Sequence, residues 1–124
     1  MFLLDSNILI YYLRGDKKVF VFLKELNETQ FTVSIISRME VMMGSHLHGI
    51  SLEQAENYLD NYRNIDLNAD IVRESVFLSR NNSKKMKFKD LIIAATAKFH
   101  HLTLVTADKD FKKLEGLKTL IYKP

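Results

Sequence analysis

The sequence predicts a single α/β domain in which helices flank a mainly parallel sheet. Three observations favour this fold class. The length of 124 residues suits one domain, and an apolar fraction of 47% is enough to build a core. Short apolar strand candidates also alternate with helical segments along the chain, which is typical of parallel α/β sheets. No repeat, low-complexity tract or linker interrupts this pattern, so residues 1–124 are treated as one domain.

The strand candidates are short apolar segments that end in polar residues or turns. The clearest covers residues 2–4, where three apolar residues are followed by Asp5, Ser6 and Asn7. A second candidate at residues 31–33 and a third at 102–106 are rich in residues that favour strands. Two weaker candidates lie around Ile65 and at residues 120–122.

Helices are predicted between these strands from apolar spacing and from capping residues. The clearest covers residues 51–62, because Ser51 and Gln54 form a capping box and the apolar residues fall on one face. The other predicted helices cover residues 8–13, 19–26, 37–46, 71–79 and 91–100.

The composition excludes several classes of protein. The chain has no cysteine, which excludes disulfides, thiolate metal sites and cysteine nucleophiles. It also has no Gly-x-Ser-x-Gly turn and no glycine-rich phosphate loop, which argues against a serine hydrolase and against a nucleoside-triphosphate enzyme. No apolar run approaches the length of a membrane helix and no export signal is visible, so a cytoplasmic protein is expected.

Positive charge is concentrated in the second half of the chain. Residues 1–70 hold ten acidic and six basic residues, whereas residues 71–124 hold five acidic and twelve basic residues. The segment 80–89 contains five basic side chains and no acid: Arg80, Lys84, Lys85, Lys87 and Lys89. Such a block attracts a polyanion through counterion release, so we expect it to hold an RNA backbone. A solvated loop and helix start is the alternative interpretation.

Four carboxylates stand where strands end or helices begin, and each has a local explanation when taken alone. Asp5 and Asp90 are positioned to cap the helices that follow them. Glu40 lies three residues after Ser37, as in a capping box, and Asp108 belongs to a turn after a strand candidate.

Taken together, the four carboxylates indicate a metal site. A parallel sheet brings the ends of its strands to one edge, where like charges would repel one another. A hard divalent cation such as Mg²⁺ or Mn²⁺ removes that cost and can activate water for phosphodiester hydrolysis. The four histidines do not supply a third ligand for a zinc site.

Four motifs in this order resemble the PIN domain, and most closely the VapC toxins of VapBC toxin–antitoxin pairs. They are residues 2–10 (FLLDSNILI), residues 37–40 (SRME) with Gly44, residues 90–95 (DLIIAA), and residues 104–108 (LVTAD) with Asp110 and Phe111. Each motif is loose alone, but the ordered set spans nearly the whole chain.

The resemblance implies a Mg²⁺- or Mn²⁺-dependent endoribonuclease that cleaves single-stranded regions of RNA as the toxin of such a pair. It also implies a homodimer and a small VapB-like antitoxin whose tail enters the active site. The motifs place the catalytic and metal-binding quartet at Asp5, Glu40, Asp90 and Asp108. By the same comparison, Asn7 and Thr106 orient the carboxylates, and Asp110 shares or replaces Asp108 in the fourth role.

Other functions remain open at this point. A phospho-receiver signalling module also has this length, a parallel sheet and an acidic Mg²⁺ pocket. It needs a pair of acids after its first strand, where this chain has only Asp5, and a phosphoacceptor on a central strand, for which Asp66 is a poor fit. A housekeeping RNA-processing PIN nuclease and a PIN domain that binds RNA without cleaving it are the remaining alternatives.

Overall fold

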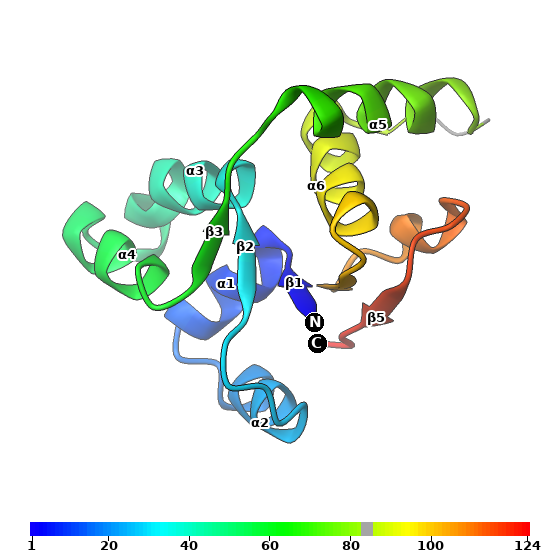
Figure 1. Cartoon of the computed structure of the whole chain (residues 1–124). Coiled ribbons are helices and arrows are strands. Elements are labelled where there is room, and N and C mark those ends of the chain that lie inside the picture. The colour runs from blue at the N-terminus through cyan, green and yellow to red at the C-terminus, as the bar shows by residue number, and fades with distance from the viewer. Residues whose placement is uncertain (83–85) are drawn as a thin grey trace.

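The computed structural model describes residues 1–82 and 86–124, and its strands in these ranges form one parallel sheet (Figure 1). The strands are β1 (Phe2–Leu4), β2 (Thr32–Ser34), β3 (Arg63–Ile65), β4 (Thr103–Thr106) and β5 (Thr119–Ile121). They lie in the order β3-β2-β1-β4-β5, and every neighbouring pair is parallel. The predicted α/β fold class with a mainly parallel sheet is therefore confirmed.

The helices lie close to where the sequence predicts them. They are α1 (Ser6–Leu13), α2 (Lys17–Glu25), α3 (Ile35–Gly44), α4 (Leu52–Leu59), α5 (Ala69–Arg80) and α6 (Phe88–Phe99). Two short 3₁₀ helices, η1 (Ser45–His48) and η2 (Lys109–Lys113), have no counterpart in the prediction. The predicted capping box of Ser51 and Gln54 is present at the start of α4. Within the described residues, no helix is both long and apolar enough to cross a membrane.

The apolar core is divided by the sheet into two clusters. Successive residues of a strand point to opposite faces, so Leu3 and Leu104 pack against α5 and α6, whereas Leu4 and Val105 pack against the helices of the other face. Figure 1 shows α5 and α6 on one side of the strands and α3 and α4 on the other. Helices on both faces leave only the edges of the sheet and the ends of its strands for chemistry.

The strand order argues against the phospho-receiver alternative. Receiver-type flavodoxin-like sheets use the order 2-1-3-4-5, whereas the sheet here has β1 between β2 and β4. Asp66 follows β3, which is an edge strand, and its side chain is exposed. A phosphoacceptor at the end of a central strand is therefore not present at that position.

Two of the predicted capping roles are wrong. Helix α3 begins at Ile35 and is capped by Ser34, whose hydroxyl oxygen accepts a hydrogen bond from the Ile36 N–H. Glu40 therefore lies well inside α3 and does not close a capping box. Helix α6 begins two residues before Asp90, so Asp90 lies in its first turn and is not its N-cap. Neither carboxylate is explained by capping.

We predict that Ser34→Ala lowers the free energy of unfolding by about 1 kcal/mol, because it removes the cap of α3. Ser37→Ala is the matched control. The Ser37 side chain is fully buried and its Oγ has no hydrogen-bond partner among the described residues, so losing that hydroxyl should be neutral or stabilising. Urea denaturation of both variants measures the difference. An equal loss for both would assign the cap to Ser37.

Candidate active site

Asp5 lies at the point in the sheet where the order of the strands reverses. The chain runs outward from β1 through β2 and β3 on one side, and β4 and β5 lie on the other. The Asp5 N–H donates to the Val105 carbonyl oxygen at 2.9 Å, which continues the pairing of β1 with β4. Asp5 Oδ1 accepts from the Ser6 N–H at 2.7 Å and caps α1, as predicted. Ligand sites of open α/β sheets lie at such switch points.

Thr106 and Asn7 hold the Asp5 carboxylate in place. Thr106 Oγ1 donates to Asp5 Oδ2 at 2.7 Å. Asn7 Nδ2 donates to Asp5 Oδ2 and to Thr106 Oγ1, each at 3.4 Å. Thr106 Oγ1 also accepts from the Asp108 N–H at 3.0 Å. A hydroxyl has one hydrogen and two lone pairs, and all of them are used here. The structure therefore places Asn7 and Thr106 beside Asp5, where the sequence comparison expects them to orient it.

Glu40 reaches the same edge of the sheet from α3. Its Oε2 accepts from Lys89 Nζ at 2.7 Å, and its Oε1 is buried without a hydrogen-bond partner among the described residues. Lys89 comes from the first turn of α6. The sequence predicts Lys89 as a contact for the RNA backbone, but the structure pairs it with one of the four carboxylates. Nothing local in the sequence indicates this pair, because 49 positions separate the two residues.

The pKa of Asp5 is raised from 3.8 to about 6, chiefly because its side chain is buried. The hydrogen bonds from Thr106 and Ser6 oppose this shift, whereas the charges of Asp90 and Glu40 add to it. Burial also raises the pKa of Asp90, and the charges of Glu40 and Asp108 raise it further. The four predicted carboxylates thus act on one another electrostatically, which is expected of groups that share one edge.

Asp108 and Asp110 are the two candidates for the fourth position, and both lie at the turn after β4. Asp108 caps η2 by accepting from the Asp110 N–H at 2.8 Å, so the turn explanation of Asp108 also holds. Its charge is one of the two that raise the pKa of Asp90. Asp110 Oδ1 lies 4.0 Å from Lys113 Nζ, three residues further along the chain. This arrangement favours Asp108 as the partner of Asp90.

The basic block is only partly described by the structure. Arg80 ends α5, Lys87 precedes α6, and both side chains are exposed. Lys84 and Lys85 lie outside the described residues. The charges of Lys89 and Lys87 lower the pKa of Asp90, so both ammonium groups act on the carboxylate edge.

The carboxylates are not drawn together into a metal-binding cluster. Within residues 1–82 and 86–124, no group of three or more His, Cys, Asp or Glu side chains has the arrangement needed to hold a metal ion. Asp5 is held by Thr106, and Glu40 is held by Lys89.

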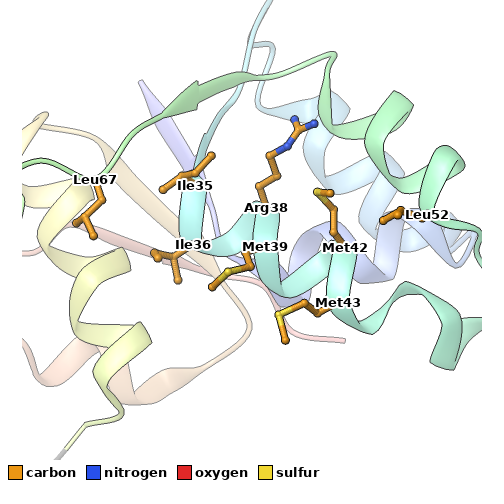
Figure 2. Close-up of a pocket in the computed structure, with 8 residues that line it drawn as sticks. All are labelled: Ile35, Ile36, Arg38, Met39, Met42, Met43, Leu52 and Leu67. Carbon is orange, nitrogen blue, oxygen red and sulfur yellow. The ribbon is translucent and has the colours of Figure 1, made fainter.

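A separate apolar pocket of about 550 Å³ lies along α3 and is called the α3 pocket below. Figure 2 shows its lining residues: Ile35, Ile36, Arg38, Met39, Met42 and Met43 of α3, Leu52 of α4, and Leu67 from the segment after β3. It contains no carboxylate and is distinct from the acidic edge. Glu40 nevertheless borders it, because positions three and four apart on a helix are neighbours. Ile36 and Met43 are those neighbours of Glu40.

A family model described as the PIN domain matches residues 2–117 of the chain. The chain belongs to the PIN-domain family. This match covers all four motifs, including the site residues Asp5, Glu40, Asp90 and Asp108. No curated protein matches the chain.

Solved structures of PIN-domain toxin–antitoxin systems resemble the whole chain. A toxin–antitoxin complex from Klebsiella pneumoniae is 32% identical, with a TM-score of 0.86 and full coverage of both chains. VapBC2 from Rickettsia felis, bound to a DNA fragment from its promoter, is 23% identical over 98% of each chain, with a TM-score of 0.82. VapC20 from Mycobacterium tuberculosis, named as a sarcin–ricin loop cleaving toxin, is 15% identical, with a TM-score of 0.70 and coverage of 95% and 99%.

We predict that Asp5→Asn does not destabilise the metal-free PIN domain at about pH 7. Because burial raises the pKa of Asp5 from 3.8 to about 6, the native state binds a proton more tightly than the unfolded chain. The charged carboxylate therefore opposes folding near neutral pH, and this penalty disappears as the pH falls through that window. The variant should melt at an equal or higher temperature than the wild type at about pH 7, and its advantage should shrink towards about pH 4.5. Melting curves in EDTA measure this, and a pH-independent difference would contradict it.

Proposed function

We propose that this PIN domain is a Mg²⁺- or Mn²⁺-dependent endoribonuclease that cleaves single-stranded regions of RNA as the toxin of a toxin–antitoxin pair. The observation that carries the proposal is the electrostatic interaction among four carboxylates from four separate segments of the chain: the charges of Glu40 and Asp90 raise the pKa of Asp5, and the charge of Asp108 raises that of Asp90. VapC20, which has the same fold, is named as a loop-cleaving toxin. The similarity to the Klebsiella pneumoniae complex, at 32% identity over the whole chain, favours the toxin role over a housekeeping one.

The donor set fits a hard divalent cation. All four candidate ligands, Asp5, Glu40, Asp90 and Asp108, offer carboxylate oxygens, and Glu40 Oε1 is buried with no partner among the described residues. The charges of Glu40 and Asp90 raise the pKa of Asp5, so a cation would relieve a repulsion that the fold already contains. Such an ion, when bound, activates water and neutralises the charge that develops on the phosphodiester.

The chain's own residues supply position and charge balance in the proposed reaction. Thr106 and Asn7 hold the Asp5 carboxylate in place through its Oδ2 atom. Asp90 lies in the first turn of α6, and Asp108 lies in the turn after β4. The net reaction is hydrolysis, in which water attacks the RNA phosphorus and a 3′-hydroxyl leaves.

The exposed basic side chains of the segment 80–87 suit an RNA backbone, and the charge of Lys87 acts on Asp90. Arg80 and Lys87 are exposed at the end of α5 and just before α6, and Lys84 and Lys85 lie between them in the sequence. Phosphate contacts of this kind position a nucleic acid without reading its sequence. We therefore assign these four residues to backbone binding and leave Lys89 to its contact with Glu40.

We predict that Glu40→Gln and Asp90→Asn each reduce the rate of RNA cleavage by roughly 100-fold or more, because each removes one negative charge from the metal site and keeps the shape of the side chain. Stability should change little. The measurement is single-turnover cleavage of a fluorescent single-stranded RNA in Mn²⁺, together with a melting curve.

Two controls sharpen this measurement. Glu53→Gln removes a charge from the exposed first turn of α4, away from the acidic edge, and should cleave like the wild type. Asp108→Asn should be inactive and Asp110→Asn active if Asp108 is the fourth acid. Cleavage by Glu40→Gln at nearly the wild-type rate would remove Glu40 from the site.

We propose that a small antitoxin inhibits this toxin and that a second copy of the chain covers the α3 pocket. The similarity to toxin–antitoxin complexes supports the antitoxin. The second copy is favoured by the chemistry of the pocket, which is lined by apolar side chains and one charge. That charge, on Arg38, is already paired with Asp60 at 2.9 Å. A two-fold contact brings identical patches together, and apolar, charge-neutral patches suit it.

We predict that Met43→Asp, at an exposed lining position of the α3 pocket, weakens self-association by roughly 100-fold, because the contact would bury an unpaired charge. Leu47→Asp is the matched control, since Leu47 is 75% exposed on η1 and does not line the pocket. Sedimentation equilibrium of the three proteins measures the effect. A monomeric wild type would contradict the homodimer, and a dimer that survives Met43→Asp would place the contact elsewhere.

A further inference from the structure

The inference concerns the ion pair between Lys89 and Glu40, which joins α6 to α3 at the acidic edge. Lys89 Nζ lies 2.7 Å from Glu40 Oε2, a short distance for a charge-assisted hydrogen bond. The Glu40 side chain is 19% exposed and that of Lys89 is 47% exposed, so the ammonium group lies on the solvent side of the carboxylate. Glu40 Oε1 remains buried and unpartnered within the described part of the chain. The lysine therefore satisfies one oxygen of Glu40 and leaves the other available.

Lys89 also faces more of the cluster than Glu40 alone. Its pKa is raised chiefly by the hydrogen bond and charge of Glu40; burial opposes this shift, and the charges of Asp90 and Asp5 each add a smaller increase. One ammonium group thus interacts with three of the four carboxylates. Lys87 also acts on Asp90 but forms no ion pair with a carboxylate of the described residues.

We propose that Lys89 is a tethered counter-cation that occupies the carboxylate edge in the absence of metal and competes with the divalent ion for Glu40. This inference rests on the proposed metal-dependent function. The physical reason is that Mg²⁺ approaches its oxygen ligands to about 2.0–2.1 Å. Lys89 occupies Glu40 Oε2 and leaves Oε1 open, so an ion that binds through Oε2, alone or together with Oε1, must displace the ammonium group. The two cations also repel each other, so metal binding must release Lys89 from Glu40.

The competition has a consequence for the reaction. Breaking the Lys89–Glu40 pair costs free energy, which makes the free energy of metal binding less favourable. Lys89 therefore raises the metal concentration at which the site fills. The released ammonium group remains tethered next to Asp90, at the start of α6.

The direct test is a Mn²⁺ titration of wild type and Lys89→Gln, with free Mn²⁺ measured by electron paramagnetic resonance. Lys89→Gln should bind Mn²⁺ roughly 3- to 10-fold more tightly, as expected when a partly exposed ion pair no longer competes. Lys87→Gln is the matched control, because it removes the same charge two positions away without breaking the pair. Its affinity should change by clearly less. Equal gains in Mn²⁺ affinity for both variants would mean that any nearby positive charge has the same effect, which would overturn the proposal. Weaker Mn²⁺ binding by Lys89→Gln would also overturn it.

Thermal stability gives a second readout that does not depend on cleavage. In EDTA, Lys89→Gln should melt about 2–5 °C below the wild type, because Glu40 loses its only cation partner among the described residues. In saturating Mn²⁺ the difference should vanish or reverse. A variant that melts like the wild type in EDTA would overturn the proposal. Lys89→Arg, which keeps the charge, should retain the wild-type behaviour in both assays and covers the case in which Lys89→Gln fails to fold.

Failure of this proposal is distinguishable from failure of the proposed function. A wild type that binds no Mn²⁺ and cleaves RNA in EDTA would overturn the metal-dependent function itself. A wild type that binds Mn²⁺ and cleaves RNA, with a Lys89→Gln variant of unchanged affinity and unchanged melting in EDTA, would overturn only the role of Lys89.

Discussion

The hydrogen bond from Thr106 Oγ1 to Asp5 Oδ2 is the contact on which the acidic edge depends. It joins the ends of β1 and β4, which are neighbours in the sheet although 101 positions separate the two residues. The same oxygen of Thr106 accepts the Asp108 N–H, so one buried hydroxyl fixes the direction of Asp5 and the start of the turn that carries Asp108. Because the Thr106 hydroxyl uses its hydrogen and both of its lone pairs, it holds the Asp5 carboxylate in one orientation.

At this edge, burial and neighbouring negative charges both raise the pKa values of carboxylates. Titratable groups that are shifted in this way cluster at functional sites. Asp5 is only 4% exposed, and the charges of Glu40 and Asp90 add to the cost of ionising it. A fold selected for stability alone would place an uncharged residue here, since burial of the Asp5 carboxylate outweighs the hydrogen bonds that it accepts. The cost is offset in part by hydrogen bonds from Thr106 and Ser6, and around Glu40 by the ammonium group of Lys89. A divalent cation would offset it further, which links the electrostatics to the proposed chemistry.

Helix α3 connects this acidic edge to the surface that we assign to a partner. Glu40 reaches the carboxylates, while Met39 and Met43 of the same helix line the α3 pocket. Ser37 and Val41 face the interior and are buried, which anchors α3 against the sheet. A partner seated in the pocket would therefore border Glu40 without touching Asp5. The proposed catalytic site and the proposed contact surface therefore use adjacent strips of one helix.

The sequence by itself determines the elements and the local chemistry of this protein. The strand at residues 2–4, the Ser51–Gln54 capping box and the position of Asp5 at a strand end all follow from patterns a few residues long. The family motifs add the four carboxylates, with Asn7 and Thr106 as their supports. The sequence also suggests caps at Ser37 and Asp90, and these are wrong because helix starts shift by a few residues under the influence of packing.

Only the tertiary structure decides which of these local features meet. The order of the strands sets β1 beside β4 and so brings Thr106 to Asp5. The packing of α3 against α6 brings Lys89, which the sequence predicts as an RNA contact, into an ion pair with Glu40. The α3 pocket likewise combines side chains from α3, α4 and the segment after β3. Such contacts join residues tens of positions apart, and no pattern of neighbouring residues encodes them because they depend on how whole elements pack.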